Sequence, residues 1–189
     1  MKKKDVYEIL VNNPIIAAVS DREKLDKALK SPCEVIFMLY GDIFTLKEDV
    51  QAVLDQDKYV FVHLDLIKGF SNDAYSLKYI QEQIKPSGVV TTKTSLVKKA
   101  KELNCFVVQR LFILDSKSIQ AGIQTIHQVT PDAVEIMPGV VPKITKEINK
   151  AVRVPIITGG LIETKHEIIE SLDAGATCIS TSCEKIWYS

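Results

Sequence analysis

Residues 154–182 read VPIITGGLIETKHEIIESLDAGATCISTS, and this stretch decides the fold. Two short apolar runs, at 154–158 and 176–180, flank a segment in which Ile168 and Leu172 have the spacing of one helix face. A strand, a helix and another strand in this order predict two parallel strands joined by a helical crossover. The stretch therefore predicts one repeat unit of an α/β protein.

The same unit recurs upstream, because six further apolar runs are each followed by an amphipathic segment. These runs lie at 15–19, 35–39, 60–64, 88–91, 106–108 and 133–136. Eight units in series predict a closed (β/α)8 barrel, the TIM barrel, as a single domain over residues 1–189, with an open doubly wound sheet as the alternative. The chain is shorter than the roughly 250 residues typical of this barrel, so we expect short loops and a shortened eighth helix.

The composition narrows the class of partner and the compartment. Lysine plus arginine and aspartate plus glutamate both number 24, which gives no global attraction to nucleic acid or to a membrane surface. No apolar run approaches the roughly 20 residues that span a bilayer, and no apolar segment follows Met1 as in a secretory signal. The four cysteines form no C-x-x-C pair. We therefore expect a cytoplasmic protein with reduced thiols and no metal site.

The residues that follow the last two predicted strands indicate a phosphate site. Gly159 and Gly160 let backbone N–H groups approach an anion, and Ser180, Thr181 and Ser182 add hydroxyl donors. The positive end of the short final helix would add to both, and loops after strands seven and eight commonly hold phosphate in this barrel. The alternative is that the glycines only form a tight turn and the hydroxyls only cap a helix.

A second group of polar residues follows the middle strands. Arg110 is suited to grip an anionic ligand, while Asp65 and Glu135 accept hydrogen bonds from ligand hydroxyls. The alternative is a structural ion-pair network that closes the barrel. The same end of the strands carries three more candidate ligand-binding residues, which are Lys68, Lys93 and Gly139. No nucleophile–base pair stands out, so we predict no catalytic residue and no cofactor.

Five strings resemble the glycerol-3-phosphate-responsive antiterminators of bacterial glycerol uptake operons. The strings are HLDLIKG at 63–69, QRLFILDS at 109–116, PDAVEIMPG at 131–139, GGLI at 159–162 and STS at 180–182. The resemblance covers nearly the whole chain, in order and at matching strand ends. It implies a (β/α)8 barrel that senses glycerol 3-phosphate and acts on leader mRNA to prevent premature termination. It also implies that Gly159, Gly160, Ser180 and Thr181 hold the phosphate, and that Asp65, Arg110 and Glu135 face the glycerol moiety or organise the barrel mouth.

Three further expectations concern partners. The candidate RNA contacts are Lys2–Lys4 and the group Lys93, Lys98, Lys99 and Lys101, although such charges commonly form a solvated face. A homo-oligomer is expected if the shortened last helix leaves an apolar surface at Trp187 and Tyr188 for a partner subunit. Two alternatives to the RNA-binding sensor stay open. They are a barrel enzyme acting on a small phosphorylated substrate, and a ligand-binding protein without an RNA role.

Overall fold

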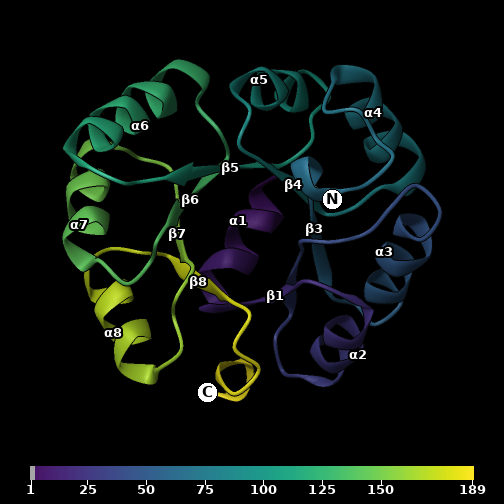
Figure 1. Cartoon of the computed structure of the whole chain (residues 1–189), viewed down its shortest axis with the longest axis horizontal. Coiled ribbons are helices and arrows are strands. Elements are labelled where there is room, and N and C mark those ends of the chain that lie inside the picture. The colour runs from purple at the N-terminus through teal and green to yellow at the C-terminus, as the bar shows by residue number, and fades with distance from the viewer. Residues whose placement is uncertain (1–2) are drawn as a thin grey trace.

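Eight parallel strands close into a barrel in the computed structural model, which describes residues 3–189 (Figure 1). Each strand pairs with the next along the chain, and the last pairs with the first. The strands are β1 (Ile15–Val19), β2 (Val35–Met38), β3 (Tyr59–His63), β4 (Gly88–Thr91), β5 (Val107–Phe112), β6 (Ala133–Met137), β7 (Ile156–Gly159) and β8 (Cys178–Thr181). The predicted (β/α)8 barrel is confirmed, and the β1–β8 pairing excludes an open sheet.

A helix follows each of the first seven strands, and together these helices form the outer ring in Figure 1. They are α2 (Arg22–Lys30), α3 (Leu46–Leu54), α4 (Ala74–Tyr79), α5 (Thr94–Glu102), α6 (Ser116–Val129), α7 (Pro142–Ala151) and α8 (Lys165–Asp173). Helix α4 continues into a π-helical turn, η2 (Ile80–Ile84), which ends at Lys85 in the left-handed conformation with φ of 59°. Because every crossover returns the chain to the same side, all strand carboxyl ends lie at one opening of the barrel.

A single 3₁₀ turn, η3 (Ile186–Tyr188), takes the place of the eighth helix, as predicted. Trp187 in this turn is only 1% exposed, and its indole N–H donates to the carbonyl oxygen of Thr181 at 2.8 Å. The expectation that Trp187 leaves an apolar surface for a partner subunit is therefore wrong, because the chain buries this ring itself. Tyr188 is exposed.

A helix that the sequence analysis did not anticipate, α1 (Lys3–Asn12), precedes β1 and lies across the barrel opening at the strand amino ends (Figure 1). Val6 and Leu10 are buried and join the interior cluster that includes Phe37 and Phe61. Their i, i+4 spacing places both on one helix face. Helix α1 thus closes the barrel opening at the strand amino ends. Of the predicted RNA contacts at 2–4, Lys2 and the side chains of the next two lysines lie outside the described residues.

Strands β5 to β8 extend further at their carboxyl ends than the apolar runs indicate. Strand β5 continues through Arg110 to Phe112, and β7 and β8 include Gly159 and Thr181. Gly159 lies opposite Ser180 in the β7–β8 register, so residues predicted to follow the strands take part in the ladder. Backbone pairing with both neighbours continues wherever the barrel wall offers a partner, which apolar runs alone do not reveal.

Buried apolar side chains fill the layer between strands and helices and the barrel interior around Phe37 and Phe61, whereas the buried polar residues His63, Arg110 and Glu135 lie at or near the strand carboxyl ends. Cys33, Cys105 and Cys178 are buried within these layers. Within residues 3–189 we find no helix with the length and hydropathy that a membrane span requires.

We expect Leu10→Ala to lower the free energy of unfolding by about 2–5 kcal/mol, because it leaves a cavity at the barrel floor. Val11→Ala is the matched control, since Val11 is 47% exposed in the same helix. Urea unfolding at neutral pH measures both changes. Equal effects of the two substitutions would show that α1 is not part of the core.

Candidate ligand-binding site

A pocket of about 700 Å³ opens at the carboxyl ends of β1, β5, β6 and β8. Its walls come from these strand ends and from the two segments that follow β7 and β8, residues 160–163 and 182–185. Six predicted ligand-binding residues line it, namely Arg110, Glu135, Gly160, Ser180, Thr181 and Ser182. The volume falls within the range of about 300–1,000 Å³ that is usual for small-molecule sites.

A buried ion pair forms the base of this pocket. The Arg110 Nε donates to Glu135 Oε2 at 2.6 Å, and the Ser180 hydroxyl donates to Glu135 Oε1 at 2.6 Å. The side chains of Arg110 and Glu135 are 7% and 0% exposed. The β5–β6 register places these two residues directly opposite each other. Both carboxylate oxygens are thus hydrogen-bonded, which offsets the cost of burying the charge.

Gly159 lies against this ion pair and leaves room for it. A Cβ at this position would lie 2.7 Å from Glu135 Oε1 and closer still to the Ser180 hydroxyl oxygen. Only glycine fits there without moving the carboxylate. Gly160 follows with φ of +78° and lines the pocket, and Leu161 has φ of +63° although it is not a glycine. The turn after β7 thus lines the pocket with the backbone of Gly160, which carries no side chain.

Gly139 lies below the pocket instead of lining it. Its N–H donates to the carbonyl oxygens of Gly159 at 2.6 Å and Gly160 at 3.2 Å. A Cβ on Gly139 would lie 2.9 Å from the Gly159 nitrogen, so the close approach of the two loops requires glycine. Gly139 therefore allows the loops after β6 and β7 to approach each other, and Gly159 leaves room for Glu135 and Ser180. Neither lines the wall.

The segment after β8 is held by Thr181. Its hydroxyl donates to the Ile162 carbonyl at 2.6 Å and accepts from the Cys183 N–H at 3.0 Å. Its own carbonyl accepts from Trp187, so Thr181 ties the β7 and β8 loops together. The predicted contribution of a final helix dipole is wrong in this respect. The turn η3 begins at Ile186, beyond Ser182, and three residues carry little dipole.

The structure does not bring Asp65, Lys68 or Lys93 into this pocket. Asp65 accepts from the Thr91 hydroxyl at 2.9 Å and from the Thr92 N–H and hydroxyl at 2.7 and 2.8 Å. Burial would raise the pKa of Asp65, but these hydrogen bonds outweigh it and hold the pKa below its usual value. Asp65 therefore secures the loop after β4.

The two lysines lie elsewhere on the same face. Lys68 bridges to Asp42 through backbone pairing and lines a neighbouring pocket of about 690 Å³ with Arg22 and Asp49. Lys93 is exposed at the start of α5. Of the three predicted residues outside the ligand pocket, Lys68 thus lines the neighbouring pocket, whereas Asp65 and Lys93 line neither.

Two basic side chains that the sequence analysis missed line the ligand pocket. Lys24 comes from the first turn of α2, and Lys185 from the segment before η3. Lys24 follows the end of β1, where the predicted site took no residues. Among the residues that the structure describes, no cluster of three or more His, Cys, Asp or Glu side chains could hold a metal ion.

His63 lies at the end of β3 and is 2% exposed. Burial and then the nearby charge of Arg110 lower the pKa of His63 to about 4, although Asp65 opposes the shift. Its Nδ1 atom has no hydrogen-bond partner among residues 3–189. A neutral imidazole beside a buried guanidinium adds no second positive charge to the mouth.

Comparison with known proteins identifies the relatives of this chain. Residues 15–187 match the family model described as glycerol-3-phosphate responsive antiterminator. The chain is similar to the crystal structure of the glycerol uptake operon antiterminator regulatory protein from Listeria monocytogenes. The TM-score is 0.90 at 31% identity, over 93% of this chain and 95% of that chain. A glycerol uptake operon antiterminator-related protein from Thermotoga maritima gives a TM-score of 0.83 at 32% identity, over 93% and 98%.

The uncharacterized protein YgcP from Escherichia coli (strain K12) is 35% identical over 182 residues, which are 96% of this chain and 95% of that protein. The similarity thus extends over almost the full length of each of these three relatives.

We expect the pKa of His63 to make stability fall with acidity. Because its folded pKa of about 4 lies below the ordinary value of 6.5, its stabilising contribution is complete above pH 6.5 and is lost as pH falls toward 4. Between pH 7 and pH 5 this amounts to about 2 kcal/mol, at 1.36 kcal/mol per pKa unit. Urea unfolding of wild type and His63→Gln measures the difference in slope.

His166→Gln is the matched control, because the His166 side chain is 80% exposed. A wild-type slope that His63→Gln leaves unchanged would contradict the assignment to His63.

Proposed function

The chain belongs to the glycerol-3-phosphate responsive antiterminator family, and we propose that it binds glycerol 3-phosphate at the barrel mouth and controls transcription termination through leader mRNA. The observation that carries the ligand proposal is the Arg110–Glu135–Ser180 network at the base of the pocket. It places a buried cation and a buried carboxylate side by side, which suits a ligand with one anionic end and one hydroxyl-bearing end.

Arg110 retains donors for an anion. Its Nε is bonded to Glu135, whereas neither terminal nitrogen of the guanidinium has a hydrogen-bond partner among the described residues. Two N–H-bearing nitrogens in one plane match two oxygens of a phosphate group. Lys24 and Lys185 line the pocket together with Glu163 and Glu184, and Glu184 is paired with Lys27 at 3.1 Å. Gly160 supplies backbone without a side chain. These groups support phosphate binding in the pocket.

Glu135 supports recognition of the glycerol part. Arg110 and Ser180 fix the Glu135 carboxylate. Its remaining lone pairs are therefore held in set directions, where they can accept hydrogen bonds from ligand hydroxyls. A ligand hydroxyl that donates to Glu135 is therefore selected by its position as well as by the negative charge of the carboxylate. Inorganic phosphate has no glycerol part and cannot use Glu135 in this way.

A regulator fits this arrangement better than an enzyme. Arg110 and Ser180 each hold one oxygen of Glu135, which suits a carboxylate that positions a ligand hydroxyl. A sensor needs only that the ligand binds two conformations with different affinity. The enzyme alternative predicts turnover of glycerol or triose phosphates, which NMR of the reaction mixture would detect and which Glu135→Gln would abolish.

We expect saturable calorimetric binding of glycerol 3-phosphate, with glycerol and inorganic phosphate much weaker. Arg110→Ala should weaken it by about 100-fold, which corresponds to the loss of a charged hydrogen-bonded contact worth nearly 3 kcal/mol. Arg153→Ala, in the loop before β7 and so at the other end of the barrel, is the matched control. Because Arg110→Ala leaves Glu135 without its partner, the double variant Arg110→Ala/Glu135→Gln tests the loss in a neutral background. Binding no tighter than that of phosphate would reject the ligand.

For the RNA partner, we expect glycerol 3-phosphate to change the affinity for leader mRNA by at least about fivefold, the lower range of coupling between two sites. Filter binding or fluorescence anisotropy at several stated salt concentrations measures it, because the salt slope separates phosphate contacts from other interactions. Equal RNA affinity with and without the ligand would rule out ligand-coupled antitermination. Weak and sequence-independent affinity in both conditions would favour a binding protein without an RNA role.

A further inference from the structure

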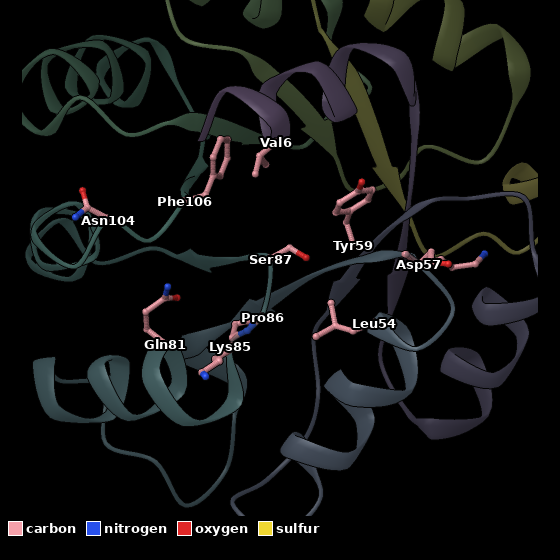
Figure 2. Close-up of a pocket in the computed structure, with 11 residues that line it drawn as sticks. Val6, Leu54, Asp57, Tyr59, Gln81, Lys85, Pro86, Ser87, Asn104 and Phe106 are labelled. Carbon is pink, nitrogen blue, oxygen red and sulfur yellow. The ribbon is translucent and has the colours of Figure 1, made fainter. Parts of the chain in front are cut away.

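A second pocket, of about 590 Å³, lies at the opposite end of the barrel beside α1. Figure 2 shows Ser87 near the middle of this pocket, with Gln81 and Tyr59 on either side. Val6 projects from α1, and Phe106 lies beside that helix. The lining residues come from four segments that are far apart in the chain, namely Val6, residues 54–59, residues 81–87 and residues 104–106. This pocket, called the lower pocket below, shares no lining residue with the pocket at the barrel mouth.

Two polar groups in this lower pocket have unused hydrogen-bonding capacity. The Gln81 Oε1 atom is buried and has no partner among the described residues. The Ser87 hydroxyl oxygen accepts from the Val60 N–H at 3.1 Å, which leaves the hydroxyl hydrogen to donate. Buried polar atoms are nearly always paired in folded proteins, so the unpaired acceptor of Gln81 points to a ligand in this pocket.

The other walls suit a flat, largely apolar ring. Phe106 packs edge-on against Phe61 with ring centroids 5.7 Å apart, which fixes the Phe106 ring in the pocket wall. Tyr59 is half-buried and faces the pocket across Ser87 (Figure 2). Val6 and Leu54 complete the apolar lining. Aromatic walls with one donor and one acceptor match the hydrogen-bonding edge of a planar heterocycle.

Of the two lysines in the lower pocket, one is held by the protein. The Lys58 Nζ donates to the carbonyl oxygens of Ser31 at 2.6 Å, Cys33 at 2.9 Å and Ala28 at 3.3 Å, so it closes the end of α2. Lys85 is exposed, and no carboxylate within residues 3–189 forms an ion pair with it. Lys85 also has a left-handed backbone conformation, which favours glycine. The backbone therefore gives no reason for a long basic side chain at this position.

We propose that the lower pocket binds a nucleobase, with Gln81 and Ser87 reading its edge and Lys85 contacting the adjoining phosphate. This inference rests on the proposed function for its source of bases, which is single-stranded leader RNA. Proteins recognise single-stranded RNA by stacking splayed bases on aromatic rings and by hydrogen bonds to base edges. Such recognition needs few charges, which agrees with equal numbers of acidic and basic residues in the chain. A free nucleotide carries the same chemistry and is the alternative source.

The test is fluorescence anisotropy of labelled homopolymer RNAs of about 10 nucleotides, a length within the site sizes usual for single-strand binding. Wild type, Gln81→Ala and Lys85→Glu are compared at two salt concentrations. Gln83→Ala and Lys117→Glu are matched controls, because both residues are exposed and neither lines the lower pocket. Calorimetry with AMP and UMP distinguishes a free nucleotide from an RNA strand, and calorimetry with glycerol 3-phosphate monitors the mouth in every variant.

We expect wild type to prefer one homopolymer, and Gln81→Ala and Lys85→Glu each to lose about tenfold in RNA affinity, the effect of one hydrogen bond or charge contact. The controls should bind as wild type does. All five proteins should bind glycerol 3-phosphate equally. Nucleotide binding as tight as RNA binding, lost in the same two variants, would support the nucleobase site with a free nucleotide as its ligand.

Wild-type RNA affinity in both pocket variants would overturn the inference and leave the proposed function intact. The absence of both RNA and nucleotide binding to wild type would also overturn it. Failure to bind glycerol 3-phosphate, with RNA binding still lost in Gln81→Ala and Lys85→Glu, would instead reject the proposed ligand and support the nucleobase site.

Discussion

The register between β5 and β6 sets Arg110 directly opposite Glu135, and the barrel mouth is organised around this buried pair. A closed barrel admits no slippage of one strand without the others, so the pair is fixed by the whole strand set. Removing two opposite charges from water is costly, and the structure offsets the cost with the Ser180 hydroxyl and with close contact. The structural and the ligand-binding interpretations of these residues are therefore compatible. The network that closes the barrel is also the base of its pocket.

The glycines of the mouth follow from the same pair. Gly159 must lack a side chain because Glu135 and Ser180 occupy the space that a Cβ would take. Gly139 must lack one because its backbone rests on the loop after β7. The strings around these residues thus combine two requirements, one for packing and one for an open anion-binding turn. That combination explains why short strings at five strand ends carry information on both the fold and the site.

The barrel could be predicted from sequence because each strand–helix unit has its own periodic signal. The site could be predicted in part, since strand ends meet at one opening whatever their order. Arg110, Glu135 and Ser180 meet there. Asp65 instead accepts a hydrogen bond from the Thr92 N–H, and such bonds between neighbouring loops cannot be predicted from a local pattern. Lys24 lies in the first turn of α2, where its local pattern is the same as that of any solvated helix lysine, so sequence alone does not assign it to the pocket.

Two other features were beyond reach from sequence. Helix α1 precedes the first strand and so lies outside the strand–helix repeat, and only the tertiary packing of Val6 and Leu10 reveals its role. The lower pocket depends on four separate segments of the chain meeting, which no local pattern encodes.

Trp187 has a consequence for how the molecule can be observed. It is the one tryptophan of the chain, and it is buried with its indole N–H bonded to Thr181, the residue that ties the β7 and β8 loops together. Indole emission shifts to longer wavelength when the ring meets water, so the intact protein should emit toward the blue. Any event that loosens the loops of the mouth would move that single emission band. The molecule thus carries a built-in optical reporter at its mouth, without a dye or an introduced label.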